Sequence, residues 1–167
     1  TFENTAQGSI TIEKMTAGGV GSFTFNRDFG DSFLLNTSGS GNNPASETFT
    51  QLLPGSYMIS EVVPSNWSLA DIDCTVDTAS TITIGGGGGF VKGDTGVTID
   101  LVDGEAITCR FYNAAWGKIV VDKVTDPQGS LQSFDFTPNY GAPFSLTDGD
   151  TPNDSGMIAP TWVEGIY

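Results

Sequence analysis

The stretch ITCRFYNAAWGKIVVDK, residues 107–123, repeats part of the chain's own beginning, FENTAQGSITIEK at residues 2–14. The two stretches align at a constant offset of 109 residues. A strand end, a short linker and a new strand start therefore occur twice, which is typical of a tandem array. The matched positions are Phe111 with Phe2, Asn113 with Asn4, Gly117 with Gly8, and Lys123 with Lys14.

This repetition divides the chain into four parts. We interpret residues 1–7 as the last strand of a preceding repeat with its linker, and residues 8–113 as one complete repeat. Residues 114–117 are then a linker, and residues 118–167 a partial second repeat. A repeat of about 105 residues is long enough to bury a core of its own.

The composition argues against several classes of partner. The 167 residues include 20 Asp and Glu against six Lys and Arg, which gives a net charge of −14, and there is no His. Such a chain is repelled by nucleic-acid phosphates and by anionic membranes. No apolar run approaches the roughly 20 residues that span a bilayer. We therefore expect a solvated surface protein that has no cofactor, binds no nucleic acid and does not insert this segment into a membrane.

Short segments with a period of two dominate the sequence and predict strands, with almost no helix. The last two expected strands should form a hairpin around Asp103-Gly104, a dipeptide typical of tight turns. Many short strands with close turns and long acidic loops indicate an all-β chain, an antiparallel β-sandwich of about immunoglobulin size in tandem repeats. The expected strands are residues 8–15, 22–25, 32–35, 47–53, 56–63, 67–76, 96–102 and 105–113.

Three polar residues lie on the apolar faces of their expected strands. Lys14 shares a face with Ile10 and Ile12 near the start of the repeat, and Glu61 shares one with Ile59 in its middle. In the last strand of the repeat, Asn113 alternates in the same way with three apolar residues, Ile107, Cys109 and Phe111. Because successive side chains of a strand point to opposite faces, parity alone predicts that all three polar groups point into the core.

Burial would make this set reactive. Desolvation lowers the pKa of a lysine and raises that of a glutamate, so the pair can exist as a neutral amine and a protonated acid. The Lys14 amine can then attack the Asn113 carboxamide while Glu61 hydrogen-bonds the amide oxygen and passes a proton to the departing ammonia. The product is an intramolecular isopeptide bond. The alternative is purely structural, with a lysine that reaches water, an exposed glutamate and an asparagine in a turn.

These residues carry a resemblance to a known family. The segment LPGSYMISEVVP at residues 53–64, the first-strand Lys14 and the closing CRFYN at residues 109–113 resemble the prealbumin-like repeats of pilins and surface adhesins, including collagen-adhesin B-type and SpaA-like domains. The resemblance covers residues 8–113 and recurs in part after Gly117. It implies that Lys14 and Asn113 form the isopeptide bond and that Glu61 assists.

Cys74 and Cys109 are the only cysteines, and both lie on apolar strand faces of one repeat. Two cysteines in an acidic, β-rich chain of surface type most often form a disulfide, and similar repeats pair cysteines at these places. Two buried free thiols are the alternative. A metal site is not expected, because two sulfurs with neither His nor a C-x-x-C motif leave the ligation incomplete.

Two loops are candidate binding sites. Asp148, Asp150 and Asp154 could supply oxygen ligands to Ca²⁺, but the full EF-hand pattern is missing, so we prefer a solvated turn. The five glycines at residues 85–89 predict a flexible excursion from the sheet edge. They do not predict a phosphate cradle, because the residues that follow indicate a strand and not a helix.

The second repeat departs from the pattern of the first. Glu164 falls three positions too early to match Glu61, and the later strands are missing. Either the chain is a piece of a longer array or another molecule completes it. In the second case a head-to-tail neighbour would add residues 2–4 as a strand and bring its Asn4 near Lys123, as an inter-repeat or intersubunit isopeptide pair.

We therefore expect a non-enzymatic structural module of an extracellular stalk, pilus or filament at the cell surface, with neighbouring copies or repeats as its partners. The alternative is an adhesin module that grips a carbohydrate or a protein with the glycine-rich and acidic loops. A carboxylate-based hydrolase ranks last, because it needs two carboxylates facing one cleft and only Glu61 is placed inward by parity.

Overall fold

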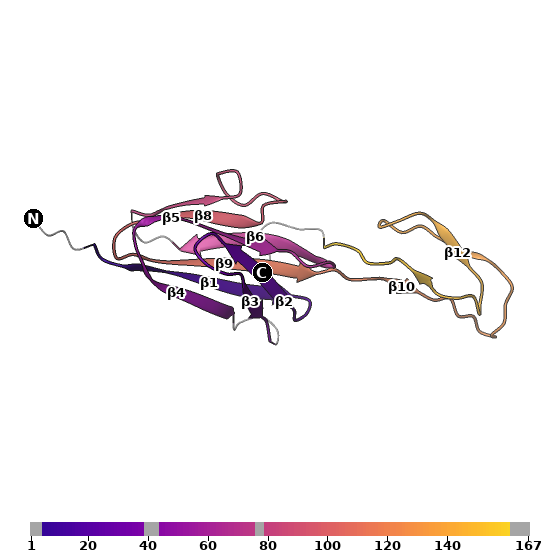
Figure 1. Cartoon of the computed structure of the whole chain (residues 1–167). Helices are drawn as coiled ribbons and strands as arrows, with labels where there is room; N and C mark the ends of the chain where they lie inside the picture. Colours follow the sequence, from indigo (N-terminus) through magenta and orange to yellow (C-terminus); the bar gives the residue numbers. More distant parts are fainter. Residues whose placement is uncertain (1–4, 39–43, 76–78, 161–167) are drawn as a thin grey trace, which may run out of the picture. The chain divides into compact units, whose positions relative to one another are not determined.

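The computed structural model describes residues 5–38, 44–75 and 79–160, and every regular element among them is a strand. The chain divides into two compact units, a first that extends to Ala115 and a second at Trp116–Pro160. Figure 1 shows the strands of both units, which are taken separately below.

The first unit is a sandwich of two sheets. Within each sheet, apolar residues alternate along the strands and pack between the two layers, as in Ile10 and Ile12 of one sheet and Phe25 and Ile59 of the other, all fully buried. The first sheet has the order β4 (Ala45–Leu52), β1 (Gly8–Ala17), β9 (Ala106–Ala115) and β6 (Trp67–Thr75). The second has the order β3 (Phe33–Asn36), β2 (Ser22–Arg27), β5 (Gly55–Val62), β8 (Gly96–Leu101) and β7 (Thr81–Ile84).

Two features differ from the sequence-based expectation. The predicted hairpin between residues 96–102 and 105–113 is wrong, because β8 and β9 belong to different sheets. The Asp103-Gly104 turn does form, with Glu105 N–H donating to the Val102 carbonyl, but the chain crosses to the other layer there so that β9 covers the opposite side of the core. The sandwich is also not antiparallel throughout, since β1 and β9 pair in parallel.

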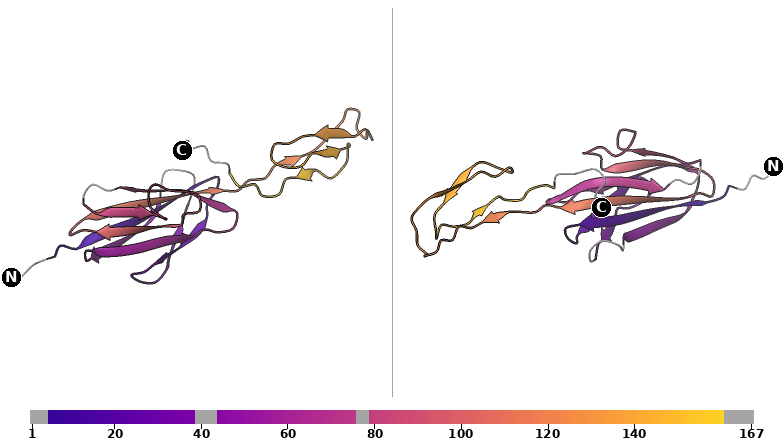
Figure 2. Two further views of the ribbon diagram at one scale, coloured as in Figure 1. Left: turned by 90° about the horizontal axis from the view of Figure 1, so that it is seen from above. Right: turned by 180° about the vertical axis from the view of Figure 1, so that it is seen from behind.

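The second unit consists of short ladders (Figure 2). Its first ladder pairs β10 (Val120–Val121) with β13 (Asn153–Asp154), and a further antiparallel bridge joins Gly117 to Ile158. Its second ladder pairs β11 (Phe134–Phe136) with β12 (Phe144–Leu146).

Candidate functional site

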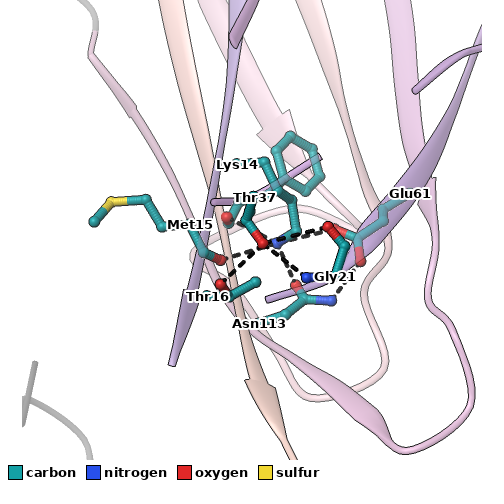
Figure 3. Close-up of polar contacts among 8 residues, drawn as sticks. Lys14, Met15, Thr16, Gly21, Thr37, Glu61 and Asn113 are labelled. Atoms are coloured by element: carbon teal, nitrogen blue, oxygen red, sulfur yellow. Dashed lines mark hydrogen bonds and ion pairs between the residues drawn. The ribbon is translucent and has the colours of Figure 1, made fainter. Parts of the chain in front are cut away.

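The structure brings Lys14, Glu61 and Asn113 together inside the first unit (Figure 3). Their exposed fractions are 0%, 3% and 1%. Lys14 and Asn113 come from the parallel neighbours β1 and β9, whereas Glu61 reaches the site from β5 in the facing sheet. The alternation in all three strands is continuous up to these positions, so the same pattern that builds the core turns the three polar groups inward.

Asn113 lies between the other two side chains. The Lys14 Nζ donates to Asn113 Oδ1 at 2.7 Å, and Asn113 Nδ2 donates to Glu61 Oε1 at 2.5 Å. The other glutamate oxygen, Oε2, is 3.5 Å from Nζ and has no hydrogen-bond partner among the described residues. Both reacting groups of an amide exchange, the amine and the carboxamide, are thus in contact with each other and with one carboxyl group.

The surroundings of Nζ hold the amine in place. Nζ also donates to the backbone carbonyls of Phe111, at 3.0 Å, and of Met15, at 3.2 Å. The Phe23 ring lies beneath it, with its centroid 4.5 Å away, and shields it from water. A buried amine with these contacts loses little rotational entropy when it reacts, which is the condition for a large effective concentration.

Burial shifts both titrations toward the neutral forms. Desolvation lowers the pKa of Lys14 to about 8, with the Glu61 charge opposing that shift. Desolvation likewise raises the pKa of Glu61, against the pull of Lys14 and the hydrogen bond from Asn113. Each carboxyl or amine in a dry site favours its uncharged state, so the proton of the pair can reside on the glutamate and leave a nucleophilic amine.

One detail of the geometry differs from the sequence-based mechanism. That mechanism places Glu61 against the amide oxygen of Asn113, whereas the structure places it against the amide nitrogen. This nitrogen departs as ammonia in an amide exchange, so the glutamate lies where a proton must be delivered.

Sequence reasoning missed part of the site. Phe23 was assigned only to a strand, although its SFTF segment is echoed by SFDF at residues 133–136, a repetition that could have singled it out. A hydroxyl pair near the lysine was also missed, in which Thr16 Oγ1 donates to Thr37 Oγ1 at 3.2 Å and Thr37 accepts from the Gly21 N–H (Figure 3). No local pattern marks the two threonines.

The first unit contains a disulfide between Cys74 and Cys109. The two residues are directly opposed on the antiparallel strands β6 and β9, which explains why their Cα atoms are only 4.0 Å apart. This finding settles the choice between a disulfide and free thiols. The bond joins β9, the strand that carries Asn113, to the edge strand β6.

The remaining predicted site residues lie in the second unit or outside the described residues. Lys123 is half-buried, and its Nζ donates to the Val124 carbonyl at 2.7 Å. Asn4 and Glu164 fall outside the described residues, so the pairing of Asn4 with Lys123 stays a prediction, and the structure does not test the comparison of Glu164 with Glu61.

The three acidic candidates for Ca²⁺ have separate partners. Asp148 accepts from Thr125 Oγ1, Asp150 from the Thr147 N–H, and Asp154 pairs with Lys118 at 2.8 Å. Over the described ranges, no cluster of three or more His, Cys, Asp or Glu side chains is arranged to hold a metal ion.

A family model described as a prealbumin-like fold domain (SpaA_4) matches residues 10–115, which is more than half of the chain. No curated protein and no solved structure matches. In the part of the chain that the structure describes, no helix is long and apolar enough to cross a membrane.

Proposed function

The chain belongs to the prealbumin-like fold domain family of SpaA type, and from this premise we propose that it is a structural module of a surface stalk or pilus, locked by an isopeptide bond between Lys14 and Asn113. The observation that carries the proposal is the contact of three fully buried side chains, amine to carboxamide to carboxyl. A buried lysine and glutamate are costly to fold around, and a covalent product with no charge removes that cost.

The reaction is an amide exchange. The neutral Nζ attacks the Asn113 side-chain carbonyl, the new N–C bond forms, and the bond from that carbon to Nδ2 breaks. Glu61, in contact with Nδ2, delivers its proton to the leaving nitrogen and regains one from the lysine, so that ammonia departs and the glutamate is unchanged. The protein is its own only substrate and reacts once, which makes it a structural protein and not an enzyme.

The parallel pairing of β1 and β9 determines how tension would load the bond. Tension that enters at the start of β1 and leaves at the end of β9 pulls these neighbours apart lengthwise, and their ladder hydrogen bonds oppose it together. A covalent link between Lys14 and Asn113 carries the same load without relying on the ladder. The chain is thus suited to a position in an extracellular stalk or filament, with neighbouring copies or repeats joined head to tail.

Intact mass tests the bond directly. The reduced protein should be lighter than its sequence mass by one ammonia, about 17 Da, and a tryptic map should link the peptides of Lys14 and Asn113. Glu61→Ala should restore the full mass. Glu13→Ala is the matched control, because Glu13 lies on the same strand as Lys14 but pairs outside the site with Arg110. An unshifted mass in the unmodified protein would sink the proposal.

Stretching of single molecules tests the role. The link bypasses the chain between two residues that are 99 positions apart. In protein whose disulfide is reduced, Glu61→Ala should therefore lengthen the fully stretched first unit by roughly 340 Å, at about 3.4 Å per residue. With the Cys74–Cys109 disulfide intact, which bridges a separation of 35 within the same segment, the gain should be about 220 Å. Equal lengths for the two proteins would show that the bond does not bear the load.

A further inference from the structure

The three reactive residues lie near one end of the sandwich. Lys14 is three residues from the end of β1, Glu61 is one residue from the end of β5, and Asn113 is two residues from the end of β9. Phe23, whose ring centroid lies 4.5 Å from Nζ, is the second residue of β2, which starts at the same end. The interior of the core therefore shields these groups from one side only, and their burial requires a cover at the end of the strands.

The turn between β1 and β2, residues 18–21, supplies part of that cover. Thr16 lies two residues after the reactive lysine and thus on the same face of β1, and its Oγ1 donates to the Gly19 carbonyl at 2.7 Å. At the other end of the turn, the Gly21 N–H donates to Thr37 Oγ1 at 2.9 Å, and the Thr37 N–H donates to the Gly21 carbonyl at 2.9 Å. Figure 3 shows Thr16, Gly21 and Thr37 around the amine. Hydrogen bonds at both ends thus hold the turn against the reactive site.

The ring of Trp67 forms the outer part of the cover. Trp67 is the first residue of β6, and its ring meets that of Phe23 edge-on, with the centroids 5.1 Å apart and the planes at 78°. Phe23 is fully buried, whereas Trp67 is partly buried. From the Lys14 amine outward, the contacts therefore run through the Phe23 ring to the Trp67 ring and then to solvent.

Gly21 lets the two rings approach the turn. A Cβ at this position would lie 3.0 Å from the Phe23 ring and 3.1 Å from the Trp67 ring, closer than carbon atoms normally pack. Gly21 does not have a left-handed backbone conformation, so the site uses its missing side chain and not its conformational freedom. A Cβ at Gly19 would likewise contact the Trp67 ring, at 3.7 Å. The turn and the two rings are therefore packed against one another.

We propose that Trp67 is a positioning residue for the cross-link of the first unit, and that it excludes water from the Lys14 amine by holding Phe23 against it. This role rests on the proposed function, since it concerns the same reaction. The attack requires a neutral amine, and a dry site favours the neutral form, whereas water beside Nζ would favour the ammonium form. In this role Trp67 acts through the Phe23 ring, and the turn at residues 18–21 keeps both rings in place.

The titration of the buried pair makes this role measurable. Desolvation is the largest cause of the lowered pKa of Lys14, about 8, and Glu61, from β5 in the facing sheet, is the charged group whose attraction opposes it. Opening the cover would remove part of the desolvation, so the pKa of Lys14 should rise and that of Glu61 should fall. Bond formation needs one proton on this pair, and the pair would keep that proton to a higher pH but hold it on the lysine. The rate should therefore be lower, and the pH above which it declines should be higher.

Removal of the Trp67 ring tests this role. The full chain, purified in denaturant before it has folded, is diluted into buffers of different pH and followed by intact mass as ammonia is lost. Trp67→Ala should slow the reaction at least about tenfold at pH 7 and raise the pH of the alkaline decline by at least about one unit, because each unit of pKa is a tenfold change in the neutral fraction. Trp67→Phe, which keeps an aromatic ring, should restore most of the rate.

Phe49→Ala is the control for a general loss of packing. Phe49 is another partly buried ring of the same core, but it packs edge-on against Phe29 and Phe33 and not against Phe23. It should leave the pH of both limbs of the rate profile unchanged, even where it slows folding.

A pair of glycine variants tests the cover without removing a ring. Gly21→Ala places a methyl group against the Phe23 and Trp67 rings and should push them apart, so its alkaline limb should move in the same direction as that of Trp67→Ala. Gly86→Ala is the matched control, because its Cβ would meet nothing within 4 Å and its backbone is not left-handed. Its rate and pH profile should equal those of the unmodified chain.

The outcomes separate this role from the proposed function. No mass deficit in the unmodified chain at any pH would overturn the proposed function, and the role of Trp67 with it. A deficit of one ammonia in the unmodified chain, with the same pH profile in Trp67→Ala and Gly21→Ala, would overturn the role of Trp67 alone. This holds even where the rate is lower, because a slower reaction with an unchanged profile means that the ring only stabilises the fold. If Trp67→Ala does not fold, the comparison of Gly21→Ala with Gly86→Ala decides.

Discussion

The hairpins β2–β3 and β11–β12 have the same register and the same stacked pair of rings. The phenylalanines of β2 nevertheless lie in the core, whereas those of β11 are partly exposed. Phe23 and Phe25 are completely buried, while Phe134 and Phe136 remain partly exposed. The comparison shows that pairing and ring stacking are decided locally, by short segments and their turns. Burial is decided by the strands that cover the hairpin from the opposite layer.

Replacing each lysine by methionine should give the largest difference in stability between the two units. Lys14→Met removes the proposed cross-link, which would close a loop between residues 99 positions apart, and should lower the free energy of unfolding of the first unit by about 4 to 5 kcal/mol. Lys123→Met should change that free energy by less than about 0.5 kcal/mol. Denaturant titration followed by amide hydrogen exchange reports each unit separately. Similar losses for both variants would mean that Lys14 has no special role.

Removal of the disulfide is the next largest effect. Replacing Cys74 and Cys109 by alanine opens a loop with a sequence separation of 35 and should lower the stability of the first unit by about 4 kcal/mol. The cysteine variant should be compared with its parent in proteins that both carry Glu61→Ala, so that no isopeptide bond restrains the same segment. The second unit has no cysteine and serves as the internal reference, so protection lost there would point to a different cause.

The pH dependence of bond formation tests whether Lys14 reacts as a buried lysine. The reactive pair holds one proton, shared between Lys14 and Glu61. Above the lowered Lys14 pKa of about 8 that proton is lost, and below the raised Glu61 pKa a second one binds. The rate after refolding should therefore be bell-shaped, falling up to tenfold per pH unit on each side. A rate that keeps rising to pH 10 would show that Lys14 titrates as if exposed.

The smallest effects concern the exposed ion pairs of the two units. Arg110–Glu13 in the first and Lys118–Asp154 in the second are both partly solvated. Glu13→Gln and Asp154→Asn should each cost less than about 1 kcal/mol, and the difference should shrink further in high salt. Thermal unfolding at two salt concentrations measures this. A larger loss for Asp154→Asn would indicate that this pair organises the open unit.

Much of the site follows from the sequence because strand parity is a local property. Alternation is sufficient to place Lys14, Glu61 and Asn113 on inward faces, where the structure has them. The choice of partner strand is not local. The crossing of β8 to β9 between sheets and the parallel pairing of β1 with β9 depend on which distant segments cover the same core, and no short pattern contains that information. The short strand β7 was missed for the same reason, since its four residues gain their order from β8.

The positions of Lys14 and Asn113 along the chain have a further consequence. Lys14 lies in β1, the first strand of the unit, and only two residues of β9 follow Asn113. Every loop that connects the two sheets of this unit therefore lies within the ring that the bond would close. A protease that cuts the exposed glycine-rich loop between β7 and β8 would open the ring without separating its ends. A locked unit of this kind would survive a single cut in any such loop as a continuous fibre, a useful property for a surface protein exposed to secreted proteases.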